Sequence, residues 1–169
     1  MIKTVDSSFY HVTILSYIVG SECEPGWETF KGNCYRMTTY FQDWTSSQYE
    51  CVEKGAHLAS ILSEEENEFL RNLSVNHSQP NNPRPLAFIG ARRGVEAENP
   101  GKFFWTDESY FEYENFMYTE NNGYYCTSLD SYDGIWNIAS CFDYRYSICK
   151  KPIKGKYFVN KFLNCKFIK

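Results

Sequence analysis

The sequence predicts an α+β fold that is held together by disulfide bonds, and three observations lead to this class. The first half of the chain carries two stretches with the start and stop signals of helices, and the second half carries short aromatic runs that are typical of strands. Tyr, Phe and Trp make up 18% of the residues, which favours β-rich structure with large side chains in the core. Seven cysteines in 169 residues indicate an oxidised, secreted framework. This length is typical of one domain, and such a domain buries about 70% of its surface.

The N-terminal residues 1–21 resemble a short signal peptide. Lys3 supplies a positive charge, residues 9–19 are mostly apolar, and Val19-Gly20-Ser21 offers small residues for cleavage. The apolar run is too short to span a bilayer, and the alternative is an ordinary apolar N-terminal strand. Two glycosylation sequons, which begin at Asn72 and Asn76, favour the same extracellular compartment.

The next stretch is expected to form a hairpin. Cys23 and Cys34 bracket two turn signals, Pro25-Gly26-Trp27 and Lys31-Gly32-Asn33. Two turn signals inside so short a loop predict a hairpin that is stapled by a disulfide.

The first helix is expected over about residues 45–54. Asp43 or Thr45 can cap its start, and Gly55 can end it. Its shared face is expected to hold four residues, Trp44, Gln48, Cys51 and Val52.

The second helix has a clearer start. Ser63 and Glu66 have the spacing of a capping box, in which each residue satisfies an amide donor of the first turn. Glu64 and Glu65 favour the positive end of the helix dipole. Its buried stripe is expected to be Phe69, Leu70 and Leu73.

Beyond the helices the pattern changes to strands and loops. Prolines and asparagines predict a loop over residues 76–85. The stretch 108–123 is long and polar with aromatic residues, and a loop of this length inside a compact domain is usually functional. Five strands are expected, over residues 86–89, 102–105, 124–129, 135–137 and 144–150.

The charge is unevenly distributed. The net charge is −4, but residues 150–169 hold seven lysines and no acidic residue, which leaves 10 basic against 21 acidic residues before that tail. An acidic body argues against a nucleic acid partner. The basic tail, residues 151–169, is expected to be a poorly ordered end. The alternative is a weak contact with a membrane surface or a heparin-like polymer.

Three motifs and the cysteine order together resemble the C-type lectin-like domain family. The motifs are Phe88-Ile89-Gly90-Ala91, Phe104-Trp105-Thr106-Asp107 and Trp136-Asn137, and they lie between the two helices and a terminal cysteine. The resemblance covers residues 22–150 and implies two helices, small antiparallel sheets and a long functional loop. The Arg92-Arg93 step and the insertion before Phe103 look most like nematode secreted members.

The resemblance also implies the disulfide pairing. Cys51 would pair with Cys149 and Cys126 with Cys141. Cys23 with Cys34 would be the extra bridge of the long-form members. Cys165 is then left over, and an odd cysteine in a secreted chain suggests an intermolecular bond or a free thiol.

Sugar-binding members of the family hold calcium in the long loop, and this chain matches their ligand positions only in part. The tripeptide position falls on Thr119-Glu120-Asn121, which lacks the family's proline, and the acidic position before Cys126 falls on Tyr124. Trp136-Asn137 is followed by Ile138, which cannot ligate a cation. Since calcium takes six to eight oxygen ligands, the set is incomplete and we expect no metal or cofactor. The similar Gln79-Pro80-Asn81 lies before the Phe88 strand and not in the long loop.

The resemblance therefore implies a recognition surface on the long loop, approximately residues 110–124, with Trp136-Asn137 beside it. The alternative is that the asparagines are ordinary loop residues. The candidate ligand-binding residues are Glu120, Asn121, Asn122, Trp136 and Asn137.

An enzyme or a structural zinc site is not expected. The sequence has no Cys-x-x-Cys or His-x-x-x-His spacing, and no nucleophile, base and orienting group stand out. His57 is expected to be a packed or partly exposed residue after the first helix.

Three interpretations of function remain open. The first is a secreted lectin-like module that binds a carbohydrate or glycoprotein through a degenerate calcium site, so that binding can be independent of calcium. The second is a protein-recognition domain in defence or signalling. The third is a structural role as a disulfide-linked dimer through Cys165.

Overall fold

The computed structural model describes residues 22–153 with four gaps, at 78, 80, 95–100 and 118–122. The expected signal peptide, most of the basic tail and Cys165 therefore lie outside the described residues. Within these described residues, the elements in order are β1 (Glu28–Phe30), β2 (Asn33–Met37), α1 (Trp44–Glu53), β3 (His57–Leu58), α2 (Glu64–Asn76), β4 (Leu86–Arg93), β5 (Phe103–Trp105), β6 (Cys126–Asp130), β7 (Trp136–Ala139) and β8 (Tyr146–Pro152).

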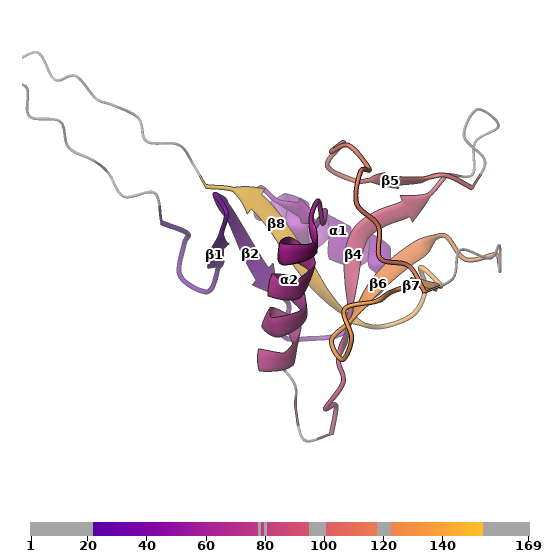
Figure 1. Ribbon diagram of the computed structural model, residues 1–169. Helices are drawn as coiled ribbons and strands as arrows, with labels where there is room; N and C mark the ends of the chain where they lie inside the picture. Colours follow the sequence, from indigo (N-terminus) through magenta and orange to yellow (C-terminus); the bar gives the residue numbers. More distant parts are fainter. Residues whose placement is uncertain (1–21, 78, 80, 95–100, 118–122, 154–169) are drawn as a thin grey trace, which may run out of the picture. The chain divides into compact units, whose positions relative to one another are not determined.

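The strands form a sheet in the order β1-β2-β8-β4-β6-β7, with β3 paired to β8 and β5 paired to β4 (Figure 1). Strands β4 and β8 are parallel, and the other pairs are antiparallel. The first and last strands of the unit are thus close neighbours through β2. The predicted α+β class is confirmed, with two helices that precede most of the strands.

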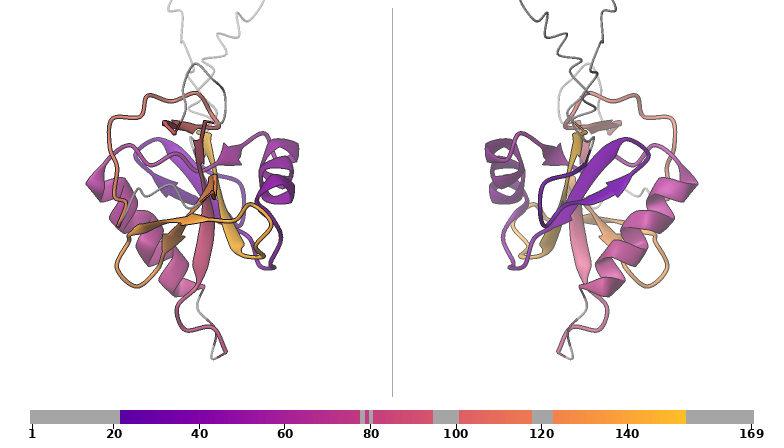
Figure 2. Two further views of the ribbon diagram at one scale, coloured as in Figure 1. Left: turned by 90° about the vertical axis from the view of Figure 1, so that its right-hand side faces the viewer. Right: turned by 90° about the vertical axis from the view of Figure 1, so that its left-hand side faces the viewer.

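The two helices lie on opposite sides of the strands (Figure 2), and β4 is buried between them. Because side chains alternate along a strand, Ala87, Ile89 and Ala91 join the core cluster that holds Leu70 of α2. Phe88 points the other way and joins the cluster of the α1 side. Burial on both faces explains why the motif around Phe88 is apolar throughout.

Helix α1 begins one residue earlier than expected. Asp43 is its N-cap and accepts a hydrogen bond from Ser46 N at 3.0 Å. Its buried residues are Trp44, Ser47 and Cys51. Val52 is 49% exposed, so the expected shared face is wrong for this residue, because the buried stripe follows the 44, 47 and 51 positions.

Helix α2 begins after Ser63, as expected, but only half of the capping box forms as that motif requires. Ser63 Oγ accepts from Glu66 N at 3.2 Å. The Glu66 carboxylate turns to Leu62 N, at 2.8 Å, and to Lys150 Nζ, at 2.6 Å. A buried ion pair therefore draws this side chain away from the expected amide of Ser63.

All five expected strands are present, and most extend further toward their C-terminal ends. Strand β8 continues through Lys151, which is 7% exposed, to Pro152. The expected start of a disordered tail at residue 151 is therefore too early, and the compact unit spans Glu22–Ile153.

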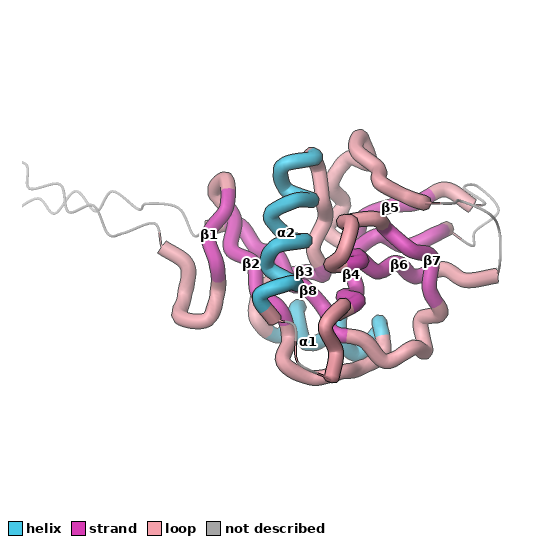
Figure 3. The backbone as a smooth tube through the Cα atoms, turned by 60° about the horizontal axis from the view of Figure 1, so that its bottom comes forward, coloured by secondary structure: helices cyan, strands magenta, loops and turns pink. Residues whose placement is uncertain are grey.

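Three disulfides join the segments that the family resemblance implied. Cys23 bonds to Cys34 in the N-terminal hairpin, Cys51 of α1 bonds to Cys149 of β8, and Cys126 bonds to Cys141. The Cα atoms of these pairs lie 5.6, 5.4 and 5.2 Å apart, respectively, within the usual range for a disulfide. The third bridge joins β6 to the segment that follows β7. Strands β6 and β7 are paired and lie side by side in Figure 3.

Candidate functional site

The expected recognition surface lies where the long loop meets β6 and β7, and we call Tyr124, Tyr125, Asn137 and Ile138 the loop edge. Glu120, Asn121 and Asn122 lie outside the described residues. Asn137 and Ile138 are half-buried on β7, which stands at the end of the sheet order. Tyr124 is 47% exposed just before β6. The structure thus places Tyr124 and Asn137 on adjacent strands or at their ends, where an external ligand can reach them.

Trp136 does not contribute its ring to this surface. Its exposed fraction is 0%, and its indole Nε1 donates a hydrogen bond to Asn67 Oδ1 of α2 at 2.7 Å. Four aromatic rings stand edge-on to it with centroids 5.3 to 6.3 Å away, those of Trp105, Phe111, Tyr113 and Phe116. The expectation that Trp136 contacts a ligand is therefore corrected, because the ring fills the core.

The described first part of the long loop is anchored by the same cluster. Phe111, Tyr113 and Phe116 are partly buried against the core. Trp136 N donates to Asn115 O at 2.8 Å, and Asn115 Nδ2 donates to Gly134 O at 2.9 Å. These three aromatic side chains therefore pack on the core and hold this part of the loop in place.

Tyr113 illustrates how the loop meets helix α2. Burial raises the pKa of its phenol, and the negative charges of Glu64 and Glu65 raise it further. The phenol is therefore a neutral donor at physiological pH. Among the large hydrophobic side chains of the described loop, Tyr110 is 85% exposed and Met117 is 58% exposed.

The described residues at the loop edge do not fit a calcium ion. Tyr124 offers a phenol where the family has a carboxylate, Asn137 offers one amide oxygen, and Ile138 offers no ligand atom. Calcium takes six to eight oxygen ligands and favours carboxylates. Across the described part of the chain, no group of three His, Cys, Asp or Glu side chains is placed to hold a metal ion.

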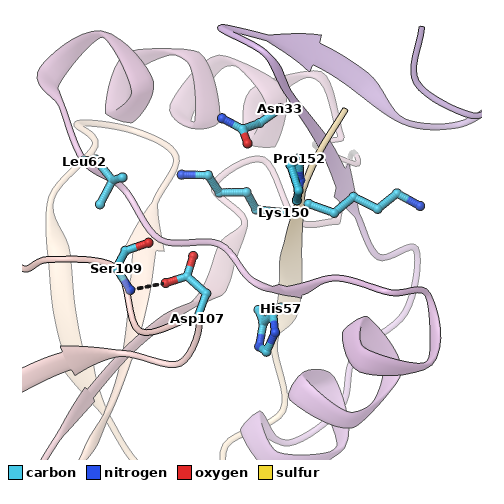
Figure 4. A pocket seen from close by; sticks show the side chains of 8 residues that line it. Asn33, His57, Leu62, Asp107, Ser109, Lys150 and Pro152 are labelled. Carbon is cyan, nitrogen blue, oxygen red and sulfur yellow. Dashed lines mark hydrogen bonds between the residues drawn. The ribbon is translucent and has the colours of Figure 1, made fainter. Parts of the chain in front are cut away.

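A separate cavity of about 360 Å³ opens between β2, β8 and the segment after β5 (Figure 4). Lys150 is its central charged group, and its Nζ lies 2.6 Å from Glu66 Oε1 and 3.0 Å from Ser60 O. Both side chains of the ion pair are 8% exposed. Sequence reasoning did not find this pair, because no local pattern links residues so far apart in the chain.

The neighbours of this ion pair are bonded to one another. Tyr35 donates its hydroxyl to Glu66, and Ser60 Oγ donates to Asp107 Oδ2 at 2.6 Å. Asp107 Oδ1 accepts from Ser109 N at 3.0 Å, the bond drawn in Figure 4. Burial and then the Glu66 carboxylate raise the pKa of Tyr35 far above its usual value. This network of hydrogen bonds and the ion pair join α2 to β2 and β8. Its role is therefore structural.

The structure also shows where His57 and the residues of the glycosylation sequons lie. His57 is exposed on β3, with its Nδ1 3.1 Å from Gln48 Nε2. Of the sequon asparagines, Asn72 is exposed on α2 and Asn76 is the last residue of that helix. Ser74 of the first sequon is buried and donates to Leu70 O at 2.9 Å.

The fold and the disulfide frame define a small binding module. The Lectin C-type domain family matches residues 40–151, well over half of the chain, and the chain therefore belongs to this family. Its members are generally binding modules without enzymatic activity. Among the helices of the described residues, none is long and apolar enough to span a membrane.

Relatives of the chain include lectins of an amphibian and a snake. It is 30% identical over 145 residues to a lectin of Pleurodeles waltl, covering 82% of this chain and 81% of the relative. It is 30% identical over 146 residues to C-type lectin lectoxin-Lio1 of Erythrolamprus poecilogyrus, and the match covers 80% of this chain and 83% of the relative. The expected similarity to nematode proteins is not supported by these relatives.

Among solved structures, the cow C-type carbohydrate-recognition domain of CD23, crystallised in the presence of a GlcNAc2Man3 oligosaccharide, superposes with a TM-score of 0.66. It is 25% identical, and the match covers 79% of this chain and 98% of that domain.

Proposed function

We propose that this protein is a secreted carbohydrate-binding module that recognises its ligand at the loop edge without calcium of the kind usual in the family. The observation that carries the proposal is the side-chain set at that edge. Tyr124 and Ile138 stand where the family places acidic calcium ligands, while exposed polar and aromatic groups remain available. Support for a sugar ligand comes from membership of the lectin family and from the lectin of Pleurodeles waltl.

The residues of the proposed site would have three roles: hydrogen bonding to the sugar, stacking on its ring and support of the loop. Asn137 would exchange hydrogen bonds with sugar hydroxyls, since an amide is both donor and acceptor, and Glu120, Asn121 and Asn122 would do so from the long loop. Tyr124 and Tyr110 offer exposed rings, and a flat aromatic face suits the apolar face of a sugar ring. The buried cluster around Trp136 would hold the start of this loop in place.

Secretion is part of the same proposal. Residues 1–21 would be a cleaved signal peptide, residues 22–153 the binding module and residues 154–169 a basic tail. The three disulfides support an oxidising compartment. The sequon asparagines Asn72 and Asn76 lie on exposed positions of α2, which supports glycosylation.

Glycan binding by single variants tests the site. The secreted protein, Asn137→Ala and Tyr124→Ala are applied to the same glycan array in EDTA, with Tyr49→Ala as the control because Tyr49 is 66% exposed on α1. We expect glycan signal from the unaltered protein and from the control, and about a tenfold loss in each loop-edge variant. Equal signal from all four proteins would contradict the location of the site.

A protein ligand is the second candidate function. The same loss of acidic ligands at Tyr124 and Ile138 favours it, and exposed Tyr110 and Met117 suit a protein interface. A protein partner would be retained after its glycans are removed enzymatically. Loss of retention after that treatment would instead favour the carbohydrate.

A further inference from the structure

A second cavity, of about 380 Å³, lies away from the loop edge. It opens beside Leu86 and Arg84, where β4 begins, and beside Tyr144 and Arg145, just before β8 begins. Strand β5 pairs with the other end of β4 (Figure 1). Tyr125 O accepts a hydrogen bond from Arg93 N at that end, so Tyr124 and Tyr125 lie on the order of 20 Å from Leu86 along β4, at about 3.3 Å per residue. Asn137 and Ile138 lie closer to the cavity, because they pair with Ser128 and Thr127 of β6, which stand opposite Phe88 and Ile89.

Two aromatic rings flank this cavity. Phe41 is 50% exposed and Tyr144 is 71% exposed. The ring of Phe41 packs on Tyr146, with centroids 4.4 Å apart. The backbones of Gln42 and Arg145 exchange two hydrogen bonds of 3.1 Å. The rings therefore stand on a fixed backbone frame while their faces remain open to solvent.

The guanidinium groups at the cavity are already neutralised. Arg145 Nη2 lies 2.7 Å from Asp143 Oδ2. Arg84 Nε lies 2.7 and 2.9 Å from the two oxygens of Asp130, and its Nη2 lies 3.4 Å from Asp133 Oδ2. Three carboxylates thus face two guanidinium groups, which leaves a net charge of −1. Such a balance offers no attraction for a phosphate or sulfate group.

The polar groups keep hydrogen-bonding capacity for a neutral ligand. Each carboxylate accepts several hydrogen bonds and each guanidinium donates up to five. Arg145 lines the cavity, and its guanidinium is held in place by the hydrogen bond from Nη2 to Asp143. Asn82 also lines the cavity and adds an amide. The lining therefore combines donors and acceptors in fixed positions with two apolar faces.

We propose that this cavity is a second ligand site, which takes a neutral sugar ring. Its volume is at the small end of ligand pockets, which suits a single ring better than a protein segment. The apolar face of the ring would stack on Tyr144 or Phe41, and its hydroxyls would bond to Asp143, Asn82 and Arg145. The proposal is independent of the function proposed for the loop edge.

Backbone amide shifts in solution test this site directly. The ¹⁵N-labelled secreted chain is titrated separately with the methyl glycosides of glucose, galactose, mannose and N-acetylglucosamine, at tens of millimolar. We expect at least one to shift the amides of residues 41, 42, 84, 86 and 143–145. Tyr144→Ala should weaken that response about tenfold, since an exposed stacking ring is lost. Tyr49→Ala, which changes an exposed tyrosine of α1 outside the cavity, should leave it unchanged.

The same titration distinguishes the cavity from the loop edge, and a neutral ligand from an anionic one. Shifts confined to residues 123–125 and 136–138 would report the loop edge alone and would overturn the second site. An unchanged response in Tyr144→Ala, or no shift near the cavity with any of the four glycosides, would also overturn it. Inorganic sulfate should neither shift these amides nor compete, and tighter binding of sulfate than of the glycosides would contradict a neutral ligand. Asp143→Asn, which keeps the side-chain shape, should weaken the glycoside response if the carboxylate accepts from a hydroxyl.

Discussion

Single residues decide how closely the segments of this fold approach one another, and Gly90 shows this best. A Cβ atom at this position would lie 2.4 Å from Leu58 O and 2.9 Å from Thr106 Oγ1. Gly90 N donates to Ala59 O at 2.9 Å, and Thr106 N donates to Gly90 O at 3.0 Å. Three segments therefore meet around a glycine of β4, which gives a physical reason for the Phe88-Ile89-Gly90-Ala91 motif.

Gly90→Ala should destabilise the domain by about 1–3 kcal/mol, because the added methyl group meets a backbone carbonyl that cannot move aside alone. The measurement is urea unfolding of the oxidised protein, followed by tryptophan fluorescence. The matched control is Ala87→Gly, also on β4, which removes a buried methyl group without adding a clash. A midpoint for Gly90→Ala equal to that of the unaltered protein would show that the segments separate more easily than the distances imply.

At the scale of single residues, the burial of Trp136 is a feature that the sequence did not predict. The Trp136-Asn137 pair was correctly placed after the long loop, but the sequence assigned both residues to ligand binding. The burial of the indole depends on Phe111, Tyr113 and Phe116, which reach it from a loop that has no clear period. No local pattern indicates that packing.

At the scale of elements, the ion pair between Lys150 of β8 and Glu66 of α2 is the main polar link. Both groups are almost fully buried, and Tyr35, Ser60 and Leu62 supply the remaining hydrogen bonds. Breaking a buried pair from one side leaves an uncompensated charge, which costs far more than loss of an exposed pair.

Lys150→Met should therefore cost about 3–5 kcal/mol of stability, measured by the same urea unfolding. Lys31→Met removes the exposed partner of Glu65, at 3.5 Å, and should cost less than about 1 kcal/mol. The double variant Lys150→Met with Glu66→Leu should recover part of the loss, because no charge remains buried. Equal losses for the single Lys150 and Lys31 variants would contradict a buried pair.

Element prediction from the sequence succeeded where the signals are local. The Asp43 and Ser63 caps and the turn glycines fixed the helices and the hairpin closely. The predicted ends of the strands were less accurate. Strand β8 extends to Pro152 because it pairs with β2, and the sequence of β8 alone does not indicate this pairing. The Glu66 side chain left its expected capping position because a distant lysine competes for it.

At the scale of the whole molecule, the longest disulfide joins helix α1 to the last strand of the compact unit, and a shorter one closes a loop within the second half. Cys51 and Cys149 are separated by 98 residues, and Cys126 and Cys141 by 15. In the chain-entropy account, loops of these lengths contribute about 4.7 and about 3 kcal/mol. The long bridge also joins α1 to β8, next to the buried lysine.

Replacing Cys51 and Cys149 together by alanine should lower the thermal midpoint more than replacing Cys126 and Cys141 together. The expected difference is about 1–2 kcal/mol in stability, because the longer loop gains more freedom when unfolded. Calorimetry of the two double variants under non-reducing conditions measures it. A larger loss from the shorter loop would point to packing around Cys126 as the dominant factor.

Cys165 remains a prediction for assembly, since it lies outside the described residues. A disulfide-linked dimer would migrate at twice the monomer mass on a non-reducing gel and would collapse on reduction. It should persist in Cys126→Ser and disappear in Cys165→Ser. A monomer at the same mobility with and without reductant would exclude this bond.

The central claim is that the loop edge binds a glycan without calcium, and one paired measurement tests it most directly. Calcium is titrated into the secreted protein by calorimetry, and glycan binding is measured in calcium and in EDTA. We predict no calcium uptake at the micromolar to millimolar level and a glycan signal that EDTA leaves unchanged, because Tyr124 and Ile138 replace carboxylate ligands. Calcium uptake together with EDTA-sensitive glycan binding would contradict the account.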